Sequence, residues 1–272
     1  MLNFMPSFEL NLNYAPLRGY ISSKRGFLLS ICKERMTHLI YSEFIFKSAA
    51  KAFEAFKNIG RGGNRVFESE GLIDVKMMGA GGGSGFSIFP DLRRYAVLLF
   101  FKTEQEALHY VERSKQLKWY MDGSADCLVC LLSPYKGHGQ WVGVDPFVYD
   151  STIMSNDDPI AVLTRATIRS NALPDFWRNV PKVAAFMHSA PALHQVGIGE
   201  YPIFMQATFS IWKNLKSLKE TAYTNTPHAE VVKKTRERNW YKEELFAEFA
   251  IRRLRAKGEK FERLKKLNIT PL

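Results

Sequence analysis

Two segments of this chain repeat one pattern of strands and helices, and this repeat limits the possible folds more than any other feature. LIYSEFIFKSAAKAFEAFKNIG (residues 39–60) and AVLTRATIRSNALPDFWRNVPK (residues 161–182) each begin with β-branched or aromatic residues and continue with a helical pattern. Next, MMGAGGGSGF corresponds to QVGIGEYP, and YAVLLFFKTEQEALHY corresponds to FMQATFSIWKNLKSLKETAY. The order strand–helix–strand–strand–helix is therefore expected in both halves.

Two copies of this length suit two tandem ferredoxin-like α+β units better than a solenoid. Two antiparallel sheets of this kind usually bury their faces by packing together as a barrel, with the helices outside. We expect a first half at residues 36–145 and a second half at residues 146–250, with the Pro-, Gly-, Asn- and Asp-rich residues 131–160 as the linker between the two sets of strands. Residues 1–35 show no clear period and are expected to form a peripheral extension. The basic residues 251–272 are expected to form a tail, either extended or an amphipathic helix.

The composition indicates a soluble protein with a basic surface. Hydrophobic residues make up 46% of the 272 residues, which is enough for a substantial core. No apolar run approaches the roughly 18 residues of a membrane span, so a cytoplasmic protein is expected. The net charge of +11 suits a solvated basic surface, and it would also suit peripheral contact with an anionic membrane. No nucleic-acid motif accompanies the charge, so we expect no nucleic-acid partner.

Motifs of several other chemistries are missing from the sequence. Cys127 and Cys130 form a CxxC pair, but their segment reads as a strand, where positions three apart face opposite sides. No second CxxC completes a zinc site, and no HExxH or GxSxG occurs. The glycine-rich GAGGGSG (residues 79–85) lacks the Lys-Ser/Thr and the helix start of a phosphate loop. It is expected to be a hairpin between strands, or a place where backbone closely approaches a flat ligand.

One of the six histidines has a setting that would suit a metal ligand. A Thr-Pro pair begins a helix expected to run from residue 226 to about Arg238, with His228 in its first turn beside an apolar face. An apolar cavity with one neutral imidazole is what a heme requires. After Tyr110 the first half has neither a histidine nor a second helix of this kind, so a single cofactor would lie in the second half. A lone histidine is more often structural, and spacing alone leaves both roles open.

The strand expected at residues 203–212 has two unlike faces. Its apolar face must belong to the core and comprises Met205, Ala207, Phe209 and Ile211. The opposite face is unusually polar for a central strand and comprises Phe204, Gln206, Thr208 and Ser210. This second face is either a partly wet surface or the polar lining of an apolar pocket, with hydrogen bonds for a ligand or bound oxygen.

Several uncommon strings occur in the same order as in a known enzyme family. They are AVLTRATIRS, FWRNVP, GIGEYP, QATFSIW, the pair Pro227-His228 and NWYKEELFAEF. Together they resemble the spheroidene monooxygenase family of carotenoid biosynthesis, over about residues 36–250. In the first half, the match is looser and rests on GSGF, PDLRRYAVL and LLSPYKGHGQWVG.

The resemblance implies a heme-containing monooxygenase that puts oxygen from O₂ into a long apolar polyene. It also implies a reduced ferredoxin-type electron donor protein and kinship with dimeric α+β-barrel heme proteins, which agrees with the repeat. By this likeness His228 becomes the candidate axial ligand of the iron. The other residues implied are Gln206, Ser210 and Arg165 as catalytic groups, and Arg169, Gly197 and Gly199 as cofactor-binding residues. Two alternatives stay open: a non-catalytic carrier of heme or another apolar ligand, and a basic binding module. The sequence does not indicate the oligomeric state.

Overall fold

The computed structural model describes residues 36–83, 85–201, 203–223 and 233–272. The elements of the first half are β1 (His38–Ile45), α2 (Ala49–Arg61), α3 (Gly63–Val66), β2 (Leu72–Gly81), β3 (Pro90–Phe101), α4 (Glu104–Arg113), α5 (Lys115–Gly123) and β4 (Asp126–Gly139). Those of the second half are β5 (Ile160–Ile168), η1 (Ser170–Ala172), α6 (Leu173–Ser189), β6 (His194–Tyr201), β7 (Met205–Trp212), α7 (Leu215–Tyr223), β8 (Tyr241–Lys257) and η2 (Leu264–Lys266). Residues 233–237 are also helical.

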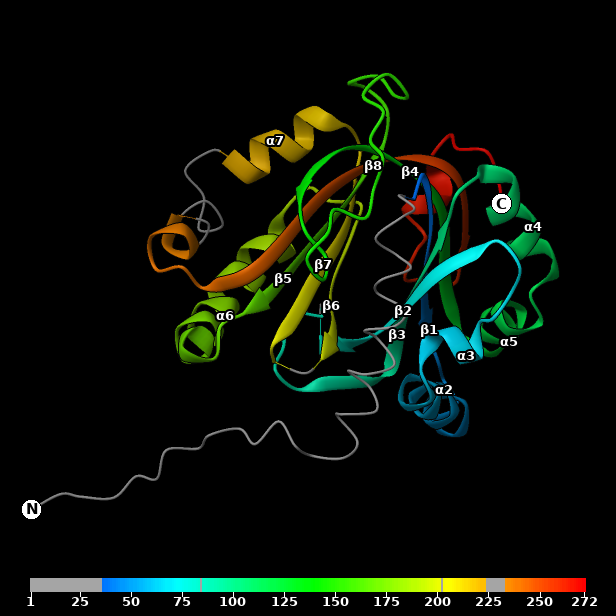
Figure 1. The fold of residues 1–272 in the computed structure, drawn as a ribbon, viewed down its shortest axis with the longest axis horizontal. Coiled ribbons are helices and arrows are strands. Elements are labelled where there is room, and N and C mark those ends of the chain that lie inside the picture. Colours follow the sequence, from blue (N-terminus) through cyan, green and yellow to red (C-terminus); the bar gives the residue numbers. More distant parts are fainter. Residues whose placement is uncertain (1–35, 84, 202, 224–232) are drawn as a thin grey trace, which may run out of the picture. The chain divides into compact units, whose positions relative to one another are not determined.

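The strands form a closed antiparallel barrel, and the helices lie outside it (Figure 1). Around the barrel the strand order is β1-β3-β2-β6-β7-β5-β8-β4. The first half therefore contributes β4-β1-β3-β2, and the second half contributes β8-β5-β7-β6, in which corresponding strands occupy corresponding places. The predicted α+β class, with an antiparallel barrel and outer helices, is confirmed.

Local sequence signals place the helix starts correctly. Thr103 begins α4 with a capping box: its hydroxyl accepts the Glu106 N–H at 3.2 Å, and the Glu106 carboxylate accepts the Thr103 N–H at 3.0 Å. Pro174 lies in the first turn of α6, where its missing N–H removes no helical hydrogen bond. Within the described ranges, no helix is both long enough and apolar enough to cross a membrane.

The helices of the first half cover one sheet face with a continuous apolar core, here called the first-half layer. Its strand residues include Ile40, Phe44, Val75, Met77, Val97, Leu99, Phe101, Val129 and Leu131. Its helix residues include Ala52, Ala55, Ala107, Leu117 and Tyr120. Polar groups within it are paired: Asn58 donates to the Tyr120 hydroxyl at 3.1 Å, and the Tyr110 hydroxyl donates to the Phe67 carbonyl at 3.3 Å. This layer is packed like an ordinary protein interior.

The opposite faces of the two sheets meet inside the barrel. Tyr41 of β1 stacks on Phe209 of β7 with ring centroids 3.5 Å apart. Glu43, which is fully buried, accepts hydrogen bonds from Tyr41 at 3.0 Å and from Arg94 Nε at 2.7 Å, and its Oε2 lies 2.8 Å from His194 Nε2. Burial alone would raise the pKa of Glu43, but His194 and Arg94 lower it to about 2. This buried cluster joins both halves of the chain.

The glycine-rich segment lies where β2 of the first half meets β6 of the second. The two strands pair around Gly79 and Gly199. Beyond this pair, Gly85, with φ of 94°, approaches Gly197 so closely that a Cβ on either residue would collide with the backbone of the other. The segment is thus a hairpin between β2 and β3, as expected, and its glycines permit the approach of two backbones.

One helix and the ends of two strands differ from those expected. The helix α5 follows α4, where no second helix was expected, because Ser114 caps it and accepts the Leu117 N–H at 3.1 Å. β4 continues to Gly139, so the connection between the halves is shorter than residues 131–160. β8 continues past residue 250 to Lys257, so the first residues of the expected tail form the end of this barrel strand. The long antiparallel pairing of β4 with β8 extends both strands, and it joins residues far apart in the sequence.

The CxxC pair lies in β4, as its strand pattern predicts. Cys127 belongs to the first-half layer, whereas Cys130 faces the barrel interior beside Glu43. Burial raises the pKa of both thiols, which favours their protonated, unreactive form. Cys32 lies outside the described residues.

Candidate functional site

The strands β8-β5-β7-β6 of the second half are here called the second sheet. Their register determines on which of the two faces each predicted site residue lies. Gly199 lies opposite Gln206, Gly197 opposite Thr208, and Gln195 opposite Ser210. Cross-strand partners share a face, and so do alternate residues along a strand. Gly197, Gly199, Gln206 and Ser210 therefore lie on one side of the sheet.

The helices of the second half cover this face, and the space between is here called the second-half layer. At one end of it, Ile160, Val162 and Trp212 pack with Leu215 and Leu218 of α7. At the other end a separate cluster contains Ile168, Ala172 and Trp240, with Phe176 against it. The two apolar clusters do not merge.

Small and polar side chains lie between these two clusters. Gln206, Thr208 and Thr164 are each only half-buried. The hydroxyls of Thr164 and Thr208 are 2.6 Å apart across β5 and β7. Ser210 is buried and accepts the Trp212 indole N–H at 2.9 Å, so its own O–H proton stays available for another acceptor. This part of the layer offers hydrogen-bonding groups between apolar walls.

The helix α6 packs loosely over the second-half layer. Among its described side chains, Asn179 is the buried one, and Phe176, Trp177, Val183 and Phe186 are half-buried. Each of α2, α4 and α5 in the first half buries at least two residues. Apolar side chains of α6 therefore keep surface that protein atoms leave uncovered.

Side-chain contacts anchor α6 to the segment that follows the expected histidine helix. Asp175 accepts hydrogen bonds from Arg238 at 2.5 Å and from the Trp240 indole at 3.2 Å. The hydrogen bond from Arg238 holds the pKa of the Asp175 carboxyl below its usual range. The Arg169 backbone N–H donates to the Trp240 carbonyl at 2.9 Å. These contacts fix the end of the second-half layer that contains the Ile168–Trp240 cluster.

Arg165 lies on the other face of the sheet, inside the barrel, and so apart from Gln206 and Ser210. Its register partner on β7 is Ala207. Its guanidinium pairs with Glu200, with Nε 3.2 Å from the carboxylate, and with Glu243. It also lies 5.6 Å from the centroid of the buried Trp141 ring. These contacts hold Arg165 inside the barrel, on the opposite face of the strands from Gln206 and Ser210.

Arg169, expected to bind the cofactor, is exposed at the end of β5. Its Nε donates to the Tyr241 carbonyl at 3.2 Å. It lines a cleft of about 670 Å³ together with Arg236, Lys242 and Glu244. Arg169 therefore lies beside the Ile168–Trp240 cluster, with its charge facing solvent.

The candidate iron ligand His228 and the start of its helix lie outside the described residues. The helical residues 233–237 agree with the expected end of that helix near Arg238. In the part of the chain that the structure describes, no three His, Cys, Asp or Glu side chains are grouped to hold a metal ion. Of the other histidines, His194 belongs to the buried Glu43 cluster.

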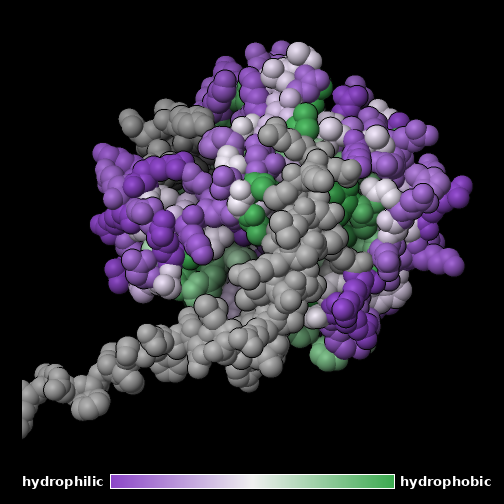
Figure 2. Space-filling model, viewed as in Figure 1, coloured by the Kyte–Doolittle hydropathy of each residue, from purple (hydrophilic) through white to green (hydrophobic). Residues whose placement is uncertain are grey.

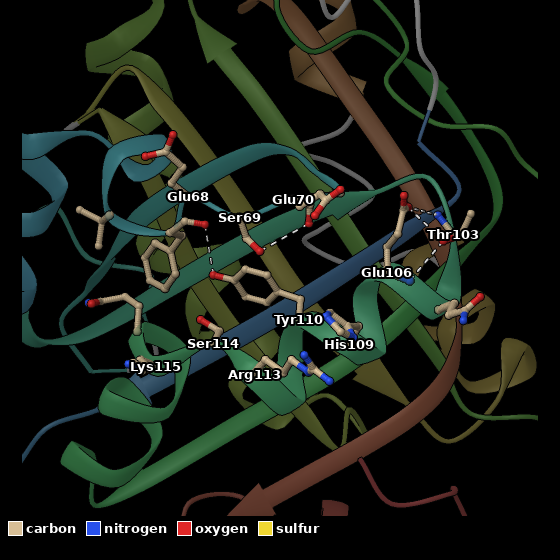
Figure 3. Close-up of a pocket in the computed structure, with 15 residues that line it drawn as sticks. Glu68, Ser69, Glu70, Thr103, Glu106, His109, Tyr110, Arg113, Ser114 and Lys115 are labelled. Atoms are coloured by element: carbon tan, nitrogen blue, oxygen red, sulfur yellow. Dashed lines mark hydrogen bonds between the residues drawn. The ribbon is translucent and has the colours of Figure 1, made fainter.

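A second cleft lies in the first half, away from every predicted site residue (Figure 3). It has a volume of about 900 Å³ between the segment 66–71 and the helices α4 and α5. Glu68 and Glu70 line one side, and His109 and Arg113 line the other. It is a shallow polar groove that opens beside the filled first-half layer.

The structure adds one residue that the sequence did not single out. Glu248 of β8 lies opposite Val162 and therefore on the helix-facing side of the second sheet. Burial raises its pKa, and the nearby Lys136, Lys219 and His138 oppose that rise. Burial of this carboxyl therefore favours its protonated form. The local sequence KEELFAEF does not indicate on which face Glu248 lies, because that face is set by the pairing of β8 with β5.

No family model matches the chain. A spheroidene monooxygenase from Rhodobacter capsulatus is 35% identical over 178 residues, which cover 65% of this chain and 74% of that protein. The chain belongs to the spheroidene monooxygenase family. Members from Cereibacter sphaeroides and Rubrivivax gelatinosus are 34% and 29% identical, and the matches cover 55% and 67% of those proteins.

Solved structures of aldoxime dehydratases share the fold of this family member. One has a TM-score of 0.55 at 9% sequence identity, and the match covers 79% of this chain and 82% of that one. A second, in complex with butyraldoxime, has a TM-score of 0.54 at 9% identity, with 79% and 80% covered. At this identity the likeness concerns the barrel and not its chemistry.

Proposed function

We propose that this protein is a heme-dependent monooxygenase that inserts one oxygen atom of O₂ into a lipophilic substrate of the carotenoid class. The other oxygen atom would leave as water, with two electrons from a reduced ferredoxin-type donor protein. Membership of the spheroidene monooxygenase family supports the oxygenase activity. The reaction type and substrate class come from the names of those relatives, and the heme comes from the family resemblance.

The observation that carries the proposal is the division of the described second-half layer into two apolar clusters with small and polar residues between them. A porphyrin is a flat apolar disc, and it needs apolar walls with little side-chain bulk between them. The clusters around Val162 and Trp240 supply such walls. Between them, Gly199 has no side chain and Gln206 and Thr208 are half-buried. The described residues of this layer therefore fit a heme.

We assign roles to residues by the face on which they lie. His228 would ligate the iron from the helix that ends near residue 238, and bound heme would supply the activation of O₂. Ser210 and Gln206 would donate hydrogen bonds to oxygen atoms at the polar stretch of β7. Arg169 would face a heme propionate, because its planar guanidinium can bind both carboxylate oxygens. Arg165 would hold the barrel together.

An absorption spectrum of the purified full chain tests the cofactor. We expect a Soret band after heme addition, and we expect it to be lost or shifted in His228→Ala. His109→Ala is the matched control, because it exchanges a histidine of the first-half cleft for alanine and should leave the band unchanged. Protein that stays colourless after heme addition would refute the proposal.

Turnover separates an oxygenase from a heme carrier on the same barrel. With O₂, a reduced ferredoxin and a carotenoid extract, we expect a product whose mass is increased by oxygen. Isotopically labelled O₂ should place the label in that product. A protein that shows the Soret band but consumes no O₂ under these conditions would be a carrier.

We also propose that the two halves are tandem ferredoxin-like units, equivalent to the two subunits of a dimeric α+β barrel. The matching strand orders β4-β1-β3-β2 and β8-β5-β7-β6 support this. Each half also places helices between its first and second strands and between its third and fourth. An experimental structure in which either half departs from this order would contradict it.

A further inference from the structure

Large apolar side chains are exposed on α2 and on the connection between β2 and β3. Phe53 and Phe56 of α2 are 61% and 51% exposed. Ile88 and Phe89, at the end of the glycine-rich hairpin, are 51% and 77% exposed, and Leu92 at the start of β3 is 60% exposed. Folded proteins rarely expose groups of large apolar residues unless the surface binds something.

These residues lie at one edge of the barrel. Ile45, the last residue of β1, pairs with Arg94 near the start of β3, and α2 packs against β3. Figure 1 places α2 and the β2–β3 connection at the lower edge of the view. Figure 2 shows a mostly hydrophilic face, with hydrophobic residues around its centre and also at that lower edge. We call Phe53, Phe56, Ile88, Phe89 and Leu92 the lower-edge surface.

Positive side chains lie on the same elements as the lower-edge surface, together with the carboxylates of Glu54 and Asp91. Lys47, Lys51 and Arg93 are exposed, and Lys57 lies 5.3 Å from the centre of the Phe53 ring. The carboxylate of Glu54 is engaged by Lys57 at 2.5 Å and by Arg61 at 3.0 Å. Aromatic side chains with neighbouring cations match the interface of an anionic bilayer, where rings enter the headgroup region and cations meet lipid phosphates.

We propose that the lower-edge surface docks on an anionic lipid bilayer, with Ile88 and Phe89 entering the headgroup region. The chain as a whole is attracted to such a surface by its net charge of +11. The apolar side chains project from α2, from the β2–β3 connection and from the start of β3, which suits insertion between lipids.

The same hairpin also lies against the second-half layer. The Gly85 backbone and the Phe86 ring pack on Gly197, which shares the sheet face of Thr208. One hairpin therefore touches both the proposed membrane surface and the proposed heme layer. A lipophilic substrate could pass from the bilayer to that layer without crossing bulk water. This last step rests on the proposed function, whereas the docking itself does not.

Co-sedimentation of the full chain with vesicles tests the docking. We expect binding to vesicles that contain phosphatidylglycerol, and weak binding to pure phosphatidylcholine. Ile88→Ser combined with Phe89→Ser should lower the partition coefficient at least about tenfold, because buried apolar area is lost. Val148→Ser is the control, because Val148 is 44% exposed near the other end of β1 and should not matter.

A pair of charge-reversal variants separates docking from general attraction. Lys47→Glu with Arg93→Glu should weaken binding several-fold more than Lys216→Glu with Lys219→Glu on α7, although the net charge changes equally. Equal losses would overturn the proposal, and so would unchanged binding of the Ile88/Phe89 double variant. Thermal unfolding by circular dichroism confirms that each variant is folded.

Two further measurements distinguish lipid docking from self-association and from the proposed heme site. Gel filtration of the Ile88/Phe89 double variant should match the parent protein, and a loss of oligomer without a loss of vesicle binding would assign the surface to a second copy. The Soret band recorded on the same samples reports the proposed heme site independently. Failure of one proposal therefore leaves the other standing.

Discussion

The helix-facing layers of the two halves rest on the same strand order but are filled differently. In the first half, β4 presents Cys127, Val129 and Leu131 to a continuous core. In the second half, the corresponding strand β8 presents Phe246 and Glu248 to a layer in two parts. The first layer contributes packing free energy. In the second, the two apolar clusters of the described residues stay separate, and the proposed cofactor would lie between them.

Phenylalanine truncation in each layer should show the largest difference. Phe44→Ala in the first-half layer should lower the free energy of unfolding by about 3–5 kcal/mol, because it leaves a cavity in a closed core. Phe176→Ala in the second-half layer should cost about 1–2 kcal/mol, because that ring is half-buried. Urea unfolding of both variants measures the contrast. Equal losses would mean that the layers are packed alike.

The buried Glu43 cluster should stabilise the contact between the halves. Glu43→Gln should lower the free energy of unfolding by about 3 kcal/mol near neutral pH, because it leaves the Arg94 charge buried without its partner. In the folded chain the pKa of Glu43 is about 2, below its ordinary value of about 4.3. The carboxylate therefore stabilises the native state above about pH 5, and this stability is lost as the pH falls toward 2.

Unfolding of the parent protein and of Glu43→Gln across the acid range measures this dependence. The difference between them should shrink as the pH falls, because both then carry a neutral side chain at position 43. A difference that stays constant down to about pH 2 would show that Glu43 does not titrate as its environment indicates.

Filling the second-half layer should oppose the proposed heme without harming the fold. Thr208→Phe adds apolar volume to a half-buried position and should raise the stability of the heme-free protein by up to about 1 kcal/mol. It should weaken heme binding at least about tenfold through overpacking. Thr208→Val, which removes the hydroxyl but adds no volume, is the control. Heme titration followed by absorbance compares the two, and equal affinities would place the heme elsewhere.

The smallest effect is expected at Glu248. Burial raises its pKa in the folded chain, so ionisation of this carboxyl opposes folding as the pH rises above the ordinary value of about 4.3. Glu248→Gln should therefore raise stability near neutral pH by a few tenths of a kcal/mol, because the side chain is half-exposed and solvent screens it. The gain should vanish at about pH 4. Stability that falls at neutral pH would indicate an ion pair with Lys136 or Lys219.

The sequence by itself determined those features that depend on neighbours along the chain. The alternation in residues 205–212 correctly placed Ala207, Phe209 and Ile211 in the core and apart from Gln206 and Thr208. It did not predict that Met205 is half-buried or that Ser210 is buried. The Thr103 capping box and the place of Pro174 needed only one helical turn of context. The repeat predicted corresponding elements in both halves, and the quoted strings identified the family.

Only the tertiary structure decided which residues meet across the barrel. Arg165 and Gln206 are both polar residues of the second sheet, but register assigns them to opposite faces. The glycine-rich hairpin reaches Gly197 by the closure of β2 on β6, which joins residues more than a hundred positions apart. The length of β8 depends on β4 in the same way. Such pairings are set by the hydrogen bonds and side-chain packing of the closed barrel, and a one-residue shift would exchange the two faces.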